Sequence, residues 1–202
     1  DFTGPDSAVA YAEACADAGV PLVTGTTGFD DDQLRALRDA ADAVPVLKAA
    51  NFSRGIAALR RAVREAAAAL PDADVEVTET HHNGKRDAPS GTAKAILREL
   101  EGARAESARE ASDRNEAADG DRVHGREGHA PRNDGEIGVH AVRAGDVTGI
   151  HEVLLAGNHE ELRLTHRAED RGVFAAGALD AAVWLDGQPP GWYDFGDVLG
   201  GD

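Results

Sequence analysis

Cysteine, methionine and aromatic residues are scarce in this chain of 202 residues. It has one cysteine, Cys15, no methionine, and 4% aromatic residues. A lone cysteine excludes a disulfide framework, and Cys15 lies in an apolar helical pattern, so we expect it to be a small core residue. There is no run of about eighteen apolar residues and no signal-peptide pattern at the start. We therefore expect no membrane-spanning helix and a cytoplasmic location.

Basic residues are also few. The 21 lysine and arginine side chains stand against 37 aspartate and glutamate side chains, for a formal net charge of −16. Such a surface argues against nucleic acid or an anionic membrane as a partner. Lysine occurs only at Lys48, Lys85 and Lys94. An acidic surface with so little lysine suggests adaptation to high intracellular salt, where screening weakens self-repulsion; the alternative is an ordinary acidic protein.

Helices and short apolar strands alternate over the first fifty residues. We predict helices at 5–18 and from about residue 30, and apolar strands at 20–24 and 44–49. Pro5 at a first helical position and Gly19 after the last one bound the first helix. The alternation is typical of a parallel, doubly wound sheet, in which ligands bind beyond the carboxyl ends of the strands. The loops at 25–28 and 49–52 occupy such ends.

The pattern changes in the second part of the chain. A helix at 53–70 and a strand at 73–80 come first, and 101–122, rich in charged residues and alanine, is interpreted as a solvated loop. From residue 123 on, apolar residues alternate with period two, which predicts a sheet with one covered face. The alternating positions are Ile137, Val139, Ala141, His151, Val153, Leu155, Leu162, Leu164 and His166. A last helix is predicted at 174–185.

The densest chemistry lies between residues 79 and 93. His81 and His82 fall at the end of the predicted strand and point to opposite faces, and Lys85 follows in a short loop. An imidazole suits acid/base chemistry near neutral pH, and an ammonium group suits the binding of an anion.

A helix is predicted to begin at the end of this stretch, with Ser90 as its N-cap. The amides of Gly91 and Thr92 are then donors at the positive end of a helix, which favours a carboxylate or a phosphate. A strand-end histidine or a Ser-Gly-Thr cap is usually structural when it stands alone. The presence of an imidazole, an ammonium group and an anion-binding helix start in one short segment favours a functional site.

These residues resemble a known signature. The sequence His-His-x-x-Lys-x-Asp-Ala-Pro-Ser-Gly-Thr-Ala at 81–93 is similar to that of the dihydrodipicolinate reductases. Further motifs follow the family's order: Asp-Phe-Thr at 1–3, Gly-Thr-Thr-Gly-Phe at 25–29, Ala-Ala-Asn-Phe-Ser at 49–53, Arg-Glu-Gly-His at 126–129, Val-Arg-Ala-Gly-Asp at 142–146 and Tyr-Asp-Phe-Gly-Asp-Val-Leu at 193–199. The resemblance covers almost the whole chain.

The resemblance implies an α/β protein with a partial Rossmann-type parallel sheet and an α+β domain whose sheet is mostly antiparallel or mixed. Residues 1–52 with 170–202 are then the later part of the dinucleotide-binding domain, and 53–169 form the substrate-binding and tetramerisation domain, so a homotetramer is expected. The family's Gly-x-Gly-x-x-Gly turn has no counterpart in this sequence. We therefore expect the chain to lack the first part of that domain.

The resemblance also implies an activity, the reduction of the cyclic dicarboxylate 4-hydroxy-tetrahydrodipicolinate with NADH or NADPH in lysine biosynthesis through diaminopimelate. It implies His81 and Lys85 as catalytic residues. The expected substrate-binding residues are His82, Ser90, Gly91 and Thr92. The expected cofactor-binding residues are Gly25, Thr26, Thr27, Ala49, Ala50, Asn51, Phe52 and Arg171.

Three other interpretations stay open. A zinc site would use His81, His82, His124 and His129, but neither paired cysteines nor a helical His-x-x-x-His supports it, so we expect no metal. The chain is alternatively an inactive oligomerisation or ligand-binding fragment. The third possibility is another Rossmann-type dehydrogenase of amino-acid metabolism, such as an aspartate or homoserine dehydrogenase, although the Ser-Gly-Thr stretch argues against it.

Overall fold

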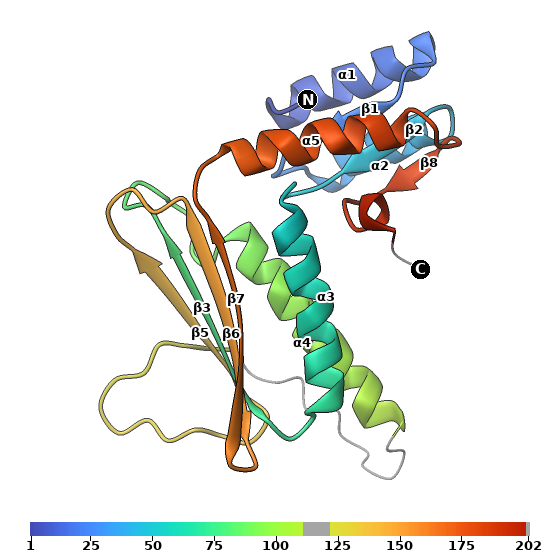
Figure 1. Cartoon of the computed structure of the whole chain (residues 1–202). Coiled ribbons are helices and arrows are strands. Elements are labelled where there is room, and N and C mark those ends of the chain that lie inside the picture. Colours follow the sequence, from blue (N-terminus) through green and yellow to red (C-terminus); the bar gives the residue numbers. More distant parts are fainter. Residues whose placement is uncertain (111–121, 201–202) are drawn as a thin grey trace. The chain divides into compact units, whose positions relative to one another are not determined.

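The computed structural model of the protein describes residues 1–110 and 122–200 (Figure 1). The chain forms two compact units, Asp1–Ala57 with Arg171–Asp202, and Ala58–Asp170. Each unit has a β-sheet of its own. None of the helices in the described ranges is long and apolar enough to cross a lipid bilayer.

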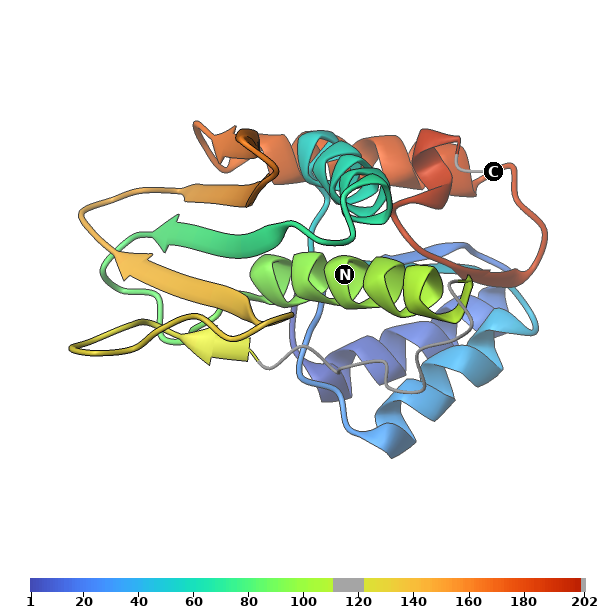
Figure 2. The same cartoon turned by 90° about the horizontal axis from the view of Figure 1, so that it is seen from below.

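The first unit is built on a parallel three-stranded sheet with the order β1-β2-β8. Its elements are β1 (Leu22–Thr24), β2 (Pro45–Lys48), β8 (Gly191–Tyr193), α1 (Pro5–Ala18), α2 (Asp31–Ala41), α5 (Gly172–Leu185) and the 3₁₀ turn η1 (Asp197–Leu199). Val46 of β2 packs in the core with α1 and α2, which lie side by side (Figure 2), and Leu47 packs in the core with α5. Helices on both faces of a parallel sheet confirm the predicted doubly wound pattern.

Local signals set the helix ends in this unit, and those at Pro5 and Gly19 are the ones that the sequence predicts. Pro5 is the first residue of α1, and Gly19 ends the helix with a left-handed φ of 68°, a conformation that glycine adopts without strain. Asp30 caps α2, because its side chain accepts a hydrogen bond from the Gln33 amide while the Gln33 side chain accepts one from the Asp30 amide. Cys15 is half-buried and packs against the core between α1 and α2.

The second unit is built on a five-stranded sheet with the order β4-β5-β3-β6-β7. Its strands are β3 (Asp74–His81), β4 (Arg122–His124), β5 (Ile137–Arg143), β6 (Gly149–Gly157) and β7 (Glu160–Ala168). β3 pairs in parallel with β5 and antiparallel with β6. The expectation of a mixed sheet is therefore confirmed.

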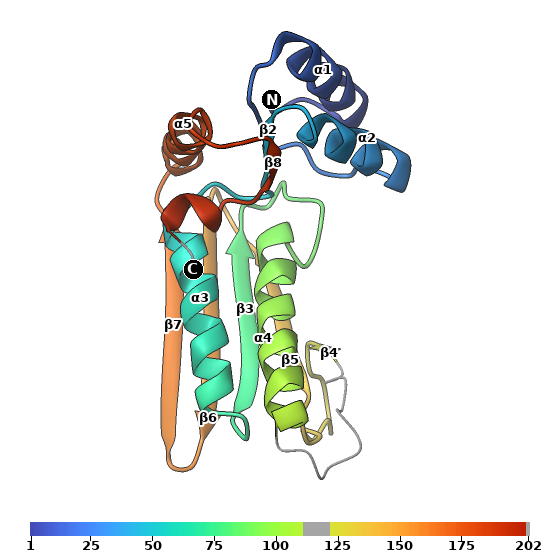
Figure 3. The same cartoon turned by 90° about the vertical axis from the view of Figure 1, so that its right-hand side faces the viewer.

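Two long helices, α3 (Arg54–Ala69) and α4 (Gly91–Glu110), cover one face of this sheet (Figure 3). The core beneath them is aliphatic, and its fully buried side chains include Val63, Val75, Ile96, Leu97, Leu100, Ile137 and Leu155. The cover is complete only over the central strands. Ala141 on β5 is exposed, and Leu162 on β7 is 38% exposed, although both are predicted to face the core.

The predicted loop at 101–122 is wrong over its first half, where α4 continues as a regular helix. Ala103 is buried on the inner face of α4, and Glu106 forms an ion pair with Arg64 of α3 at 2.7 Å. Alanine, glutamate and arginine are strong helix formers, so the helix continues without a large apolar residue. The part of the prediction at 111–121 lies outside the described residues.

Gly177 in the middle of α5 lies where no side chain fits. A Cβ atom there would overlap the carbonyl oxygen of Phe52 and lie 3.0 Å from the Phe195 ring. We expect Gly177→Ala to lower the free energy of unfolding by about 1–3 kcal/mol, the usual cost of overpacking. Urea denaturation measures this loss.

Gly102→Ala in α4 is the matched control, because its Cβ would meet nothing closer than an Arg64 nitrogen at 3.6 Å. Alanine favours a helix over glycine by about 1 kcal/mol, so this variant should be as stable as the wild type or more stable. Equal effects of the two substitutions would show that α5 does not pack closely on Phe52.

Candidate active site

The acid/base candidates lie on β3 and in the loop that joins it to α4. Along β3, the side chains of Val75, Val77, Glu79 and His81 share one face, because alternate strand residues point the same way. The two valines and Glu79 are fully buried, and the His81 side chain is 11% exposed. A carboxylate thus occupies a core position next to the predicted catalytic histidine.

Glu79 is held by donors from three segments of the chain. The guanidinium of Arg143, at the end of β5, donates to both carboxylate oxygens at 2.9 and 2.7 Å. The backbone amide of Ser90 donates to Oε1 at 3.1 Å, and Nδ1 of His81 contacts Oε2. Arg143 also donates to the carbonyl oxygen of Asp87 at 2.7 Å, which fixes its position.

These contacts set the protonation of Glu79 and His81. Burial favours the neutral acid, but hydrogen bonds from Arg143 and His81 outweigh it, and the pKa of Glu79 lies below its ordinary value. The pKa of His81 also lies below its ordinary value. Burial is the main cause, and the charges of Lys85 and Arg143 lower the pKa further, whereas the contact with Glu79 raises it. Because a carboxylate only accepts hydrogen bonds, Nδ1 of His81 carries a proton and Nε2 is the open nitrogen.

Ser90 and His151 extend the network to β6. Ser90 caps α4 as predicted, since its hydroxyl accepts a hydrogen bond from the Ala93 amide at 3.1 Å. The same hydroxyl lies 3.1 Å from Nε2 of His151, whose ring stands edge-on to that of His81 with the centroids 5.2 Å apart. Burial, helped by the nearby His81, lowers the pKa of His151 to about 4. The His151 imidazole is therefore neutral in the folded protein above about pH 4.

Lys85 and His82 lie in the loop after β3. The Lys85 ammonium is 2.8 Å from a carboxylate oxygen of Asp87, and its charge contributes to the lowered pKa of His81. His82 lies just past the strand end and is half-buried. The structure therefore brings the two predicted catalytic residues, His81 and Lys85, within electrostatic reach of each other.

The start of α4 offers a backbone donor. The amide and the hydroxyl of Ser90 are both engaged within the protein. Gly91 is exposed, and Thr92 is buried. Within the described residues the Gly91 amide donates no hydrogen bond, so it is an open donor at a helix N-terminus.

The predicted cofactor-binding residues lie in the first unit. The loop at 25–27 follows β1 and the loop at 49–52 follows β2, so both stand at the carboxyl ends of neighbouring parallel strands. A hydrogen bond of 3.1 Å from the Ala49 amide to the carbonyl of Thr24 links the start of the second loop to the last residue of β1. Arg171 is the N-cap residue of α5 in the same unit.

No group of three or more histidine, cysteine, aspartate or glutamate side chains that could hold a metal ion occurs among residues 1–110 and 122–200.

Comparison with known proteins identifies the family. The family model described as dihydrodipicolinate reductase, N-terminus, matches residues 1–52, and the one described as dihydrodipicolinate reductase, C-terminus, matches residues 55–199. The chain belongs to the dihydrodipicolinate reductase family.

Relatives and a solved structure agree with this assignment. The 4-hydroxy-tetrahydrodipicolinate reductase of Haloarcula marismortui is 58% identical over 98% of this chain and 74% of its own length, and that of Natronomonas pharaonis is 56% identical over 98% and 76%. The solved structure of dipicolinate-bound dihydrodipicolinate reductase from Paenisporosarcina sp. TG-14 matches with a TM-score of 0.71 at 25% identity, covering 96% of this chain and 71% of that one.

Dihydrodipicolinate reductases are oxidoreductases of lysine biosynthesis, and the family assignment favours this function over an inactive fragment or another amino-acid dehydrogenase. The relatives from Haloarcula and Natronomonas come from halophiles. They support the expectation, drawn from the acidic surface, of adaptation to high salt.

Three residues that organise this site are not among the site residues predicted from the sequence: Glu79, Arg143 and His151. Each stands in phase with apolar positions of its strand, and Arg143 lies opposite His81 in the register of β3 and β5. Such residues can be recognised in a sequence as titratable residues at strand positions that otherwise face the core. A titratable group buried there requires hydrogen-bond partners.

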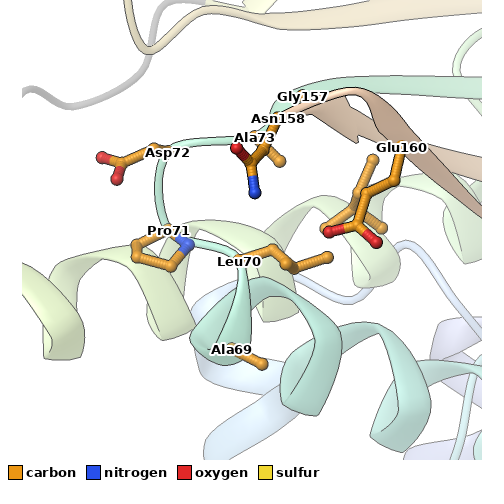
Figure 4. A pocket seen from close by; sticks show the side chains of 9 residues that line it. Ala69, Leu70, Pro71, Asp72, Ala73, Gly157, Asn158 and Glu160 are labelled. Carbon is orange, nitrogen blue, oxygen red and sulfur yellow. The ribbon is translucent and has the colours of Figure 1, made fainter.

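A hollow lies in the second unit, at the end of the sheet opposite His81 (Figure 4). It has a volume of about 510 Å³ and is lined by the α3–β3 turn and the β6–β7 hairpin. Its polar side chains are Asp72, Asn158 and Glu160, and none of its lining residues within the described ranges is basic. Two carboxylates repel a dicarboxylate, so this hollow does not suit the substrate of the family.

His151 makes the stability of the second unit depend on pH. Its imidazole binds a proton below about pH 6.5 in the unfolded chain, but only below about pH 4 in the folded protein. Between these values the unfolded state binds more protons, so the stability that His151 confers is complete above about pH 6.5 and is lost as the pH falls toward 4. Between about pH 6.5 and pH 4 the free energy of unfolding of the wild type should fall by about 3 kcal/mol because of His151, at about 1.4 kcal/mol per pH unit. We expect His151→Phe to abolish this part of the fall.

Urea denaturation at a series of pH values measures the effect. His129→Phe replaces an exposed histidine and should retain the pH dependence of the wild type. A pH dependence left unchanged by His151→Phe would mean that His151 is not buried in its neutral form.

Proposed function

We propose that His81 is the general acid of this reductase, in the reduction of 4-hydroxy-tetrahydrodipicolinate to tetrahydrodipicolinate in lysine biosynthesis. The observation that carries the proposal is the buried carboxylate of Glu79, which contacts Nδ1 of His81 and is itself held by Arg143. A buried charge requires strong local compensation. Here the contacts that compensate the charge of Glu79 also fix the orientation of the His81 imidazole at the end of β3. An acid/base group requires such a fixed orientation.

Bound NADH or NADPH supplies the hydride. The loops at 25–27 and 49–52 would hold its nicotinamide end, because doubly wound sheets bind nucleotides at the carboxyl ends of their parallel strands. Both loops lie at strand ends, and the hydrogen bond from Ala49 to Thr24 links the second loop to the end of β1; these features fit that role. Arg171 at the start of α5 is a further candidate contact for the cofactor.

The 4-hydroxyl group of the substrate leaves as water, which gives a conjugated ring. Hydride addition to that ring leaves negative charge that a proton must neutralise. Nε2 of His81 lies on the ring edge away from Glu79 and is the nitrogen from which that proton is donated. A lowered pKa makes the imidazolium a stronger acid. Lys85 is the partner of His81 in donating this proton, and its charge stabilises the anion that forms.

The two carboxylates of the substrate need cations and amides as partners. Lys85 provides the charge, and Gly91 and Thr92 provide donors at the start of α4. His82 is the further substrate contact, whereas Ser90 contributes by holding the helix start and Glu79. Assembly into a homotetramer through the sheet of the second unit belongs to this proposal as well.

We expect His81→Gln to lower kcat about 10²-fold or more, the usual contribution of a positioned general acid. The Kd for the cofactor should change little, because the cofactor candidates lie in the first unit. The assay follows NAD(P)H oxidation in a protein of the relatives' full length. His159→Gln, in the exposed β6–β7 turn, is the control. Near wild-type turnover of His81→Gln would remove His81 from the mechanism.

We expect Lys85→Met to weaken the binding of 2,6-pyridinedicarboxylate about tenfold or more, because a hydrogen bond to a charged group contributes about 1.5–3 kcal/mol. Calorimetric titration of the chain with this planar dianion measures the effect. Arg98→Met removes an exposed cation from α4 and should leave the Kd unchanged. Equal Kd values for wild type and Lys85→Met would contradict the proposed anion site.

A further inference from the structure

Two residues enclose His81 from opposite sides. Glu79 contacts Nδ1. On the other side, the ring lies against Gly149 at the start of β6, where a Cβ atom would stand 3.2 Å from Nε2 and 3.5 Å from Cδ2. The missing side chain at Gly149 keeps space beside the nitrogen that a proton donor must present to its substrate.

We propose that Glu79, Arg143 and Gly149 are positioning residues of the proton donor. Glu79 keeps a proton on Nδ1 of His81, Arg143 fixes Glu79 by binding both of its oxygens, and Gly149 leaves room at Nε2. This inference rests on the proposed role of His81 and extends it by assigning what fixes the tautomer and the orientation of the ring.

The hydrogen-bond inventory supports the tautomer. A neutral imidazole has one donor nitrogen and one acceptor nitrogen, and only a donor can bond to the Glu79 carboxylate. The pKa of Glu79 lies below its ordinary value because hydrogen bonds from Arg143 and His81 outweigh burial, so Glu79 stays ionised. His81 therefore presents Nε2 without a proton when neutral, and with one when it has been charged for donation.

Arg143 is needed because Glu79 would otherwise be a buried anion whose partners, the Ser90 amide and the His81 imidazole, are both uncharged. With Arg143 in place, the cluster of Arg143, Glu79 and neutral His81 has no net charge. The other titratable groups that face His81 are Lys85 from the loop and His151 from β6. The next strand adds His166, which stands opposite His151 in the register of β6 and β7.

This charge count predicts opposite effects of two substitutions. Glu79→Gln leaves the cluster with a charge of +1, so protonation of His81 becomes harder and its titration midpoint moves to lower pH. Arg143→Gln leaves the cluster with a charge of −1, so protonation becomes easier and the midpoint moves to higher pH. A substitution that only loosened the fold would not produce shifts of opposite sign.

Nuclear magnetic resonance of the histidine rings in the 202-residue chain tests the inference. The His81 signals are assigned by their loss in His81→Gln. We expect the Nδ1–H tautomer in the wild type, and midpoint shifts of about one pH unit in the two directions. In Glu79→Gln the tautomers should mix, because an amide both donates and accepts.

Arg143→Gln leaves an uncompensated buried carboxylate and is the variant most prone to unfold. Two further variants therefore keep the test decisive. The double variant with Glu79→Gln and Arg143→Gln restores a neutral cluster, and its midpoint should return close to that of the wild type while the tautomer preference is lost. Glu161→Gln, an exposed carboxylate at the start of β7, is the control and should change neither property.

Gly149→Ala tests the space at Nε2. We expect kcat to fall about tenfold or more, because small misplacements at a reacting centre are costly, with the His81 titration midpoint unchanged. Unchanged kcat and KM would overturn the role of Gly149.

Midpoints that move in the same direction in Glu79→Gln and Arg143→Gln, or a predominant Nε2–H tautomer in the wild type, would overturn the roles of Glu79 and Arg143. If the ring behaves as expected but His81→Gln retains turnover, the proposed function fails and the positioning stands.

Discussion

An ionised carboxylate in the core constrains the whole second unit. Taking such a group out of water costs several kcal/mol unless partners replace the lost water. Glu79 finds its partners in separate segments: a guanidinium at the end of β5, an amide at the start of α4 and an imidazole at the end of β3. The strands and the helix must therefore meet in one register for the charge to be tolerated, and the same contacts fix the orientation of His81.

The network gives two neighbouring histidines different tasks. His81 is partly exposed, contacts a carboxylate and has one open ring nitrogen. His151, with its ring centroid 5.2 Å away, is buried and neutral and is bound to the hydroxyl that caps α4. One imidazole is thus available to exchange a proton with a ligand, while the other is confined to a structural role. Environment, not residue type, assigns these roles.

Features that neighbouring residues determine could be predicted from the sequence. The cap at Ser90 acts within three residues, and the alternation of helices and strands in the first unit is equally local. The partners of Glu79 could not be predicted in this way, because Arg143 lies 64 positions away, and the contact of Ser90 with His151 spans 61 positions. The second half of α4 differs from the predicted loop because an ion pair with α3 and helix propensity maintain it in place of large apolar residues.

The central claim is that the segment from the end of β3 to the start of α4 binds the dicarboxylate and presents Nε2 of His81 to it. The most direct test is to titrate 2,6-pyridinedicarboxylate into isotope-labelled protein while recording backbone-amide and imidazole resonances. We expect the largest changes at His81, Lys85 and Gly91, with the amides at 157–160 unaffected. Changes confined to 157–160, or unchanged resonances of His81 and Gly91 at saturation, would contradict the claim.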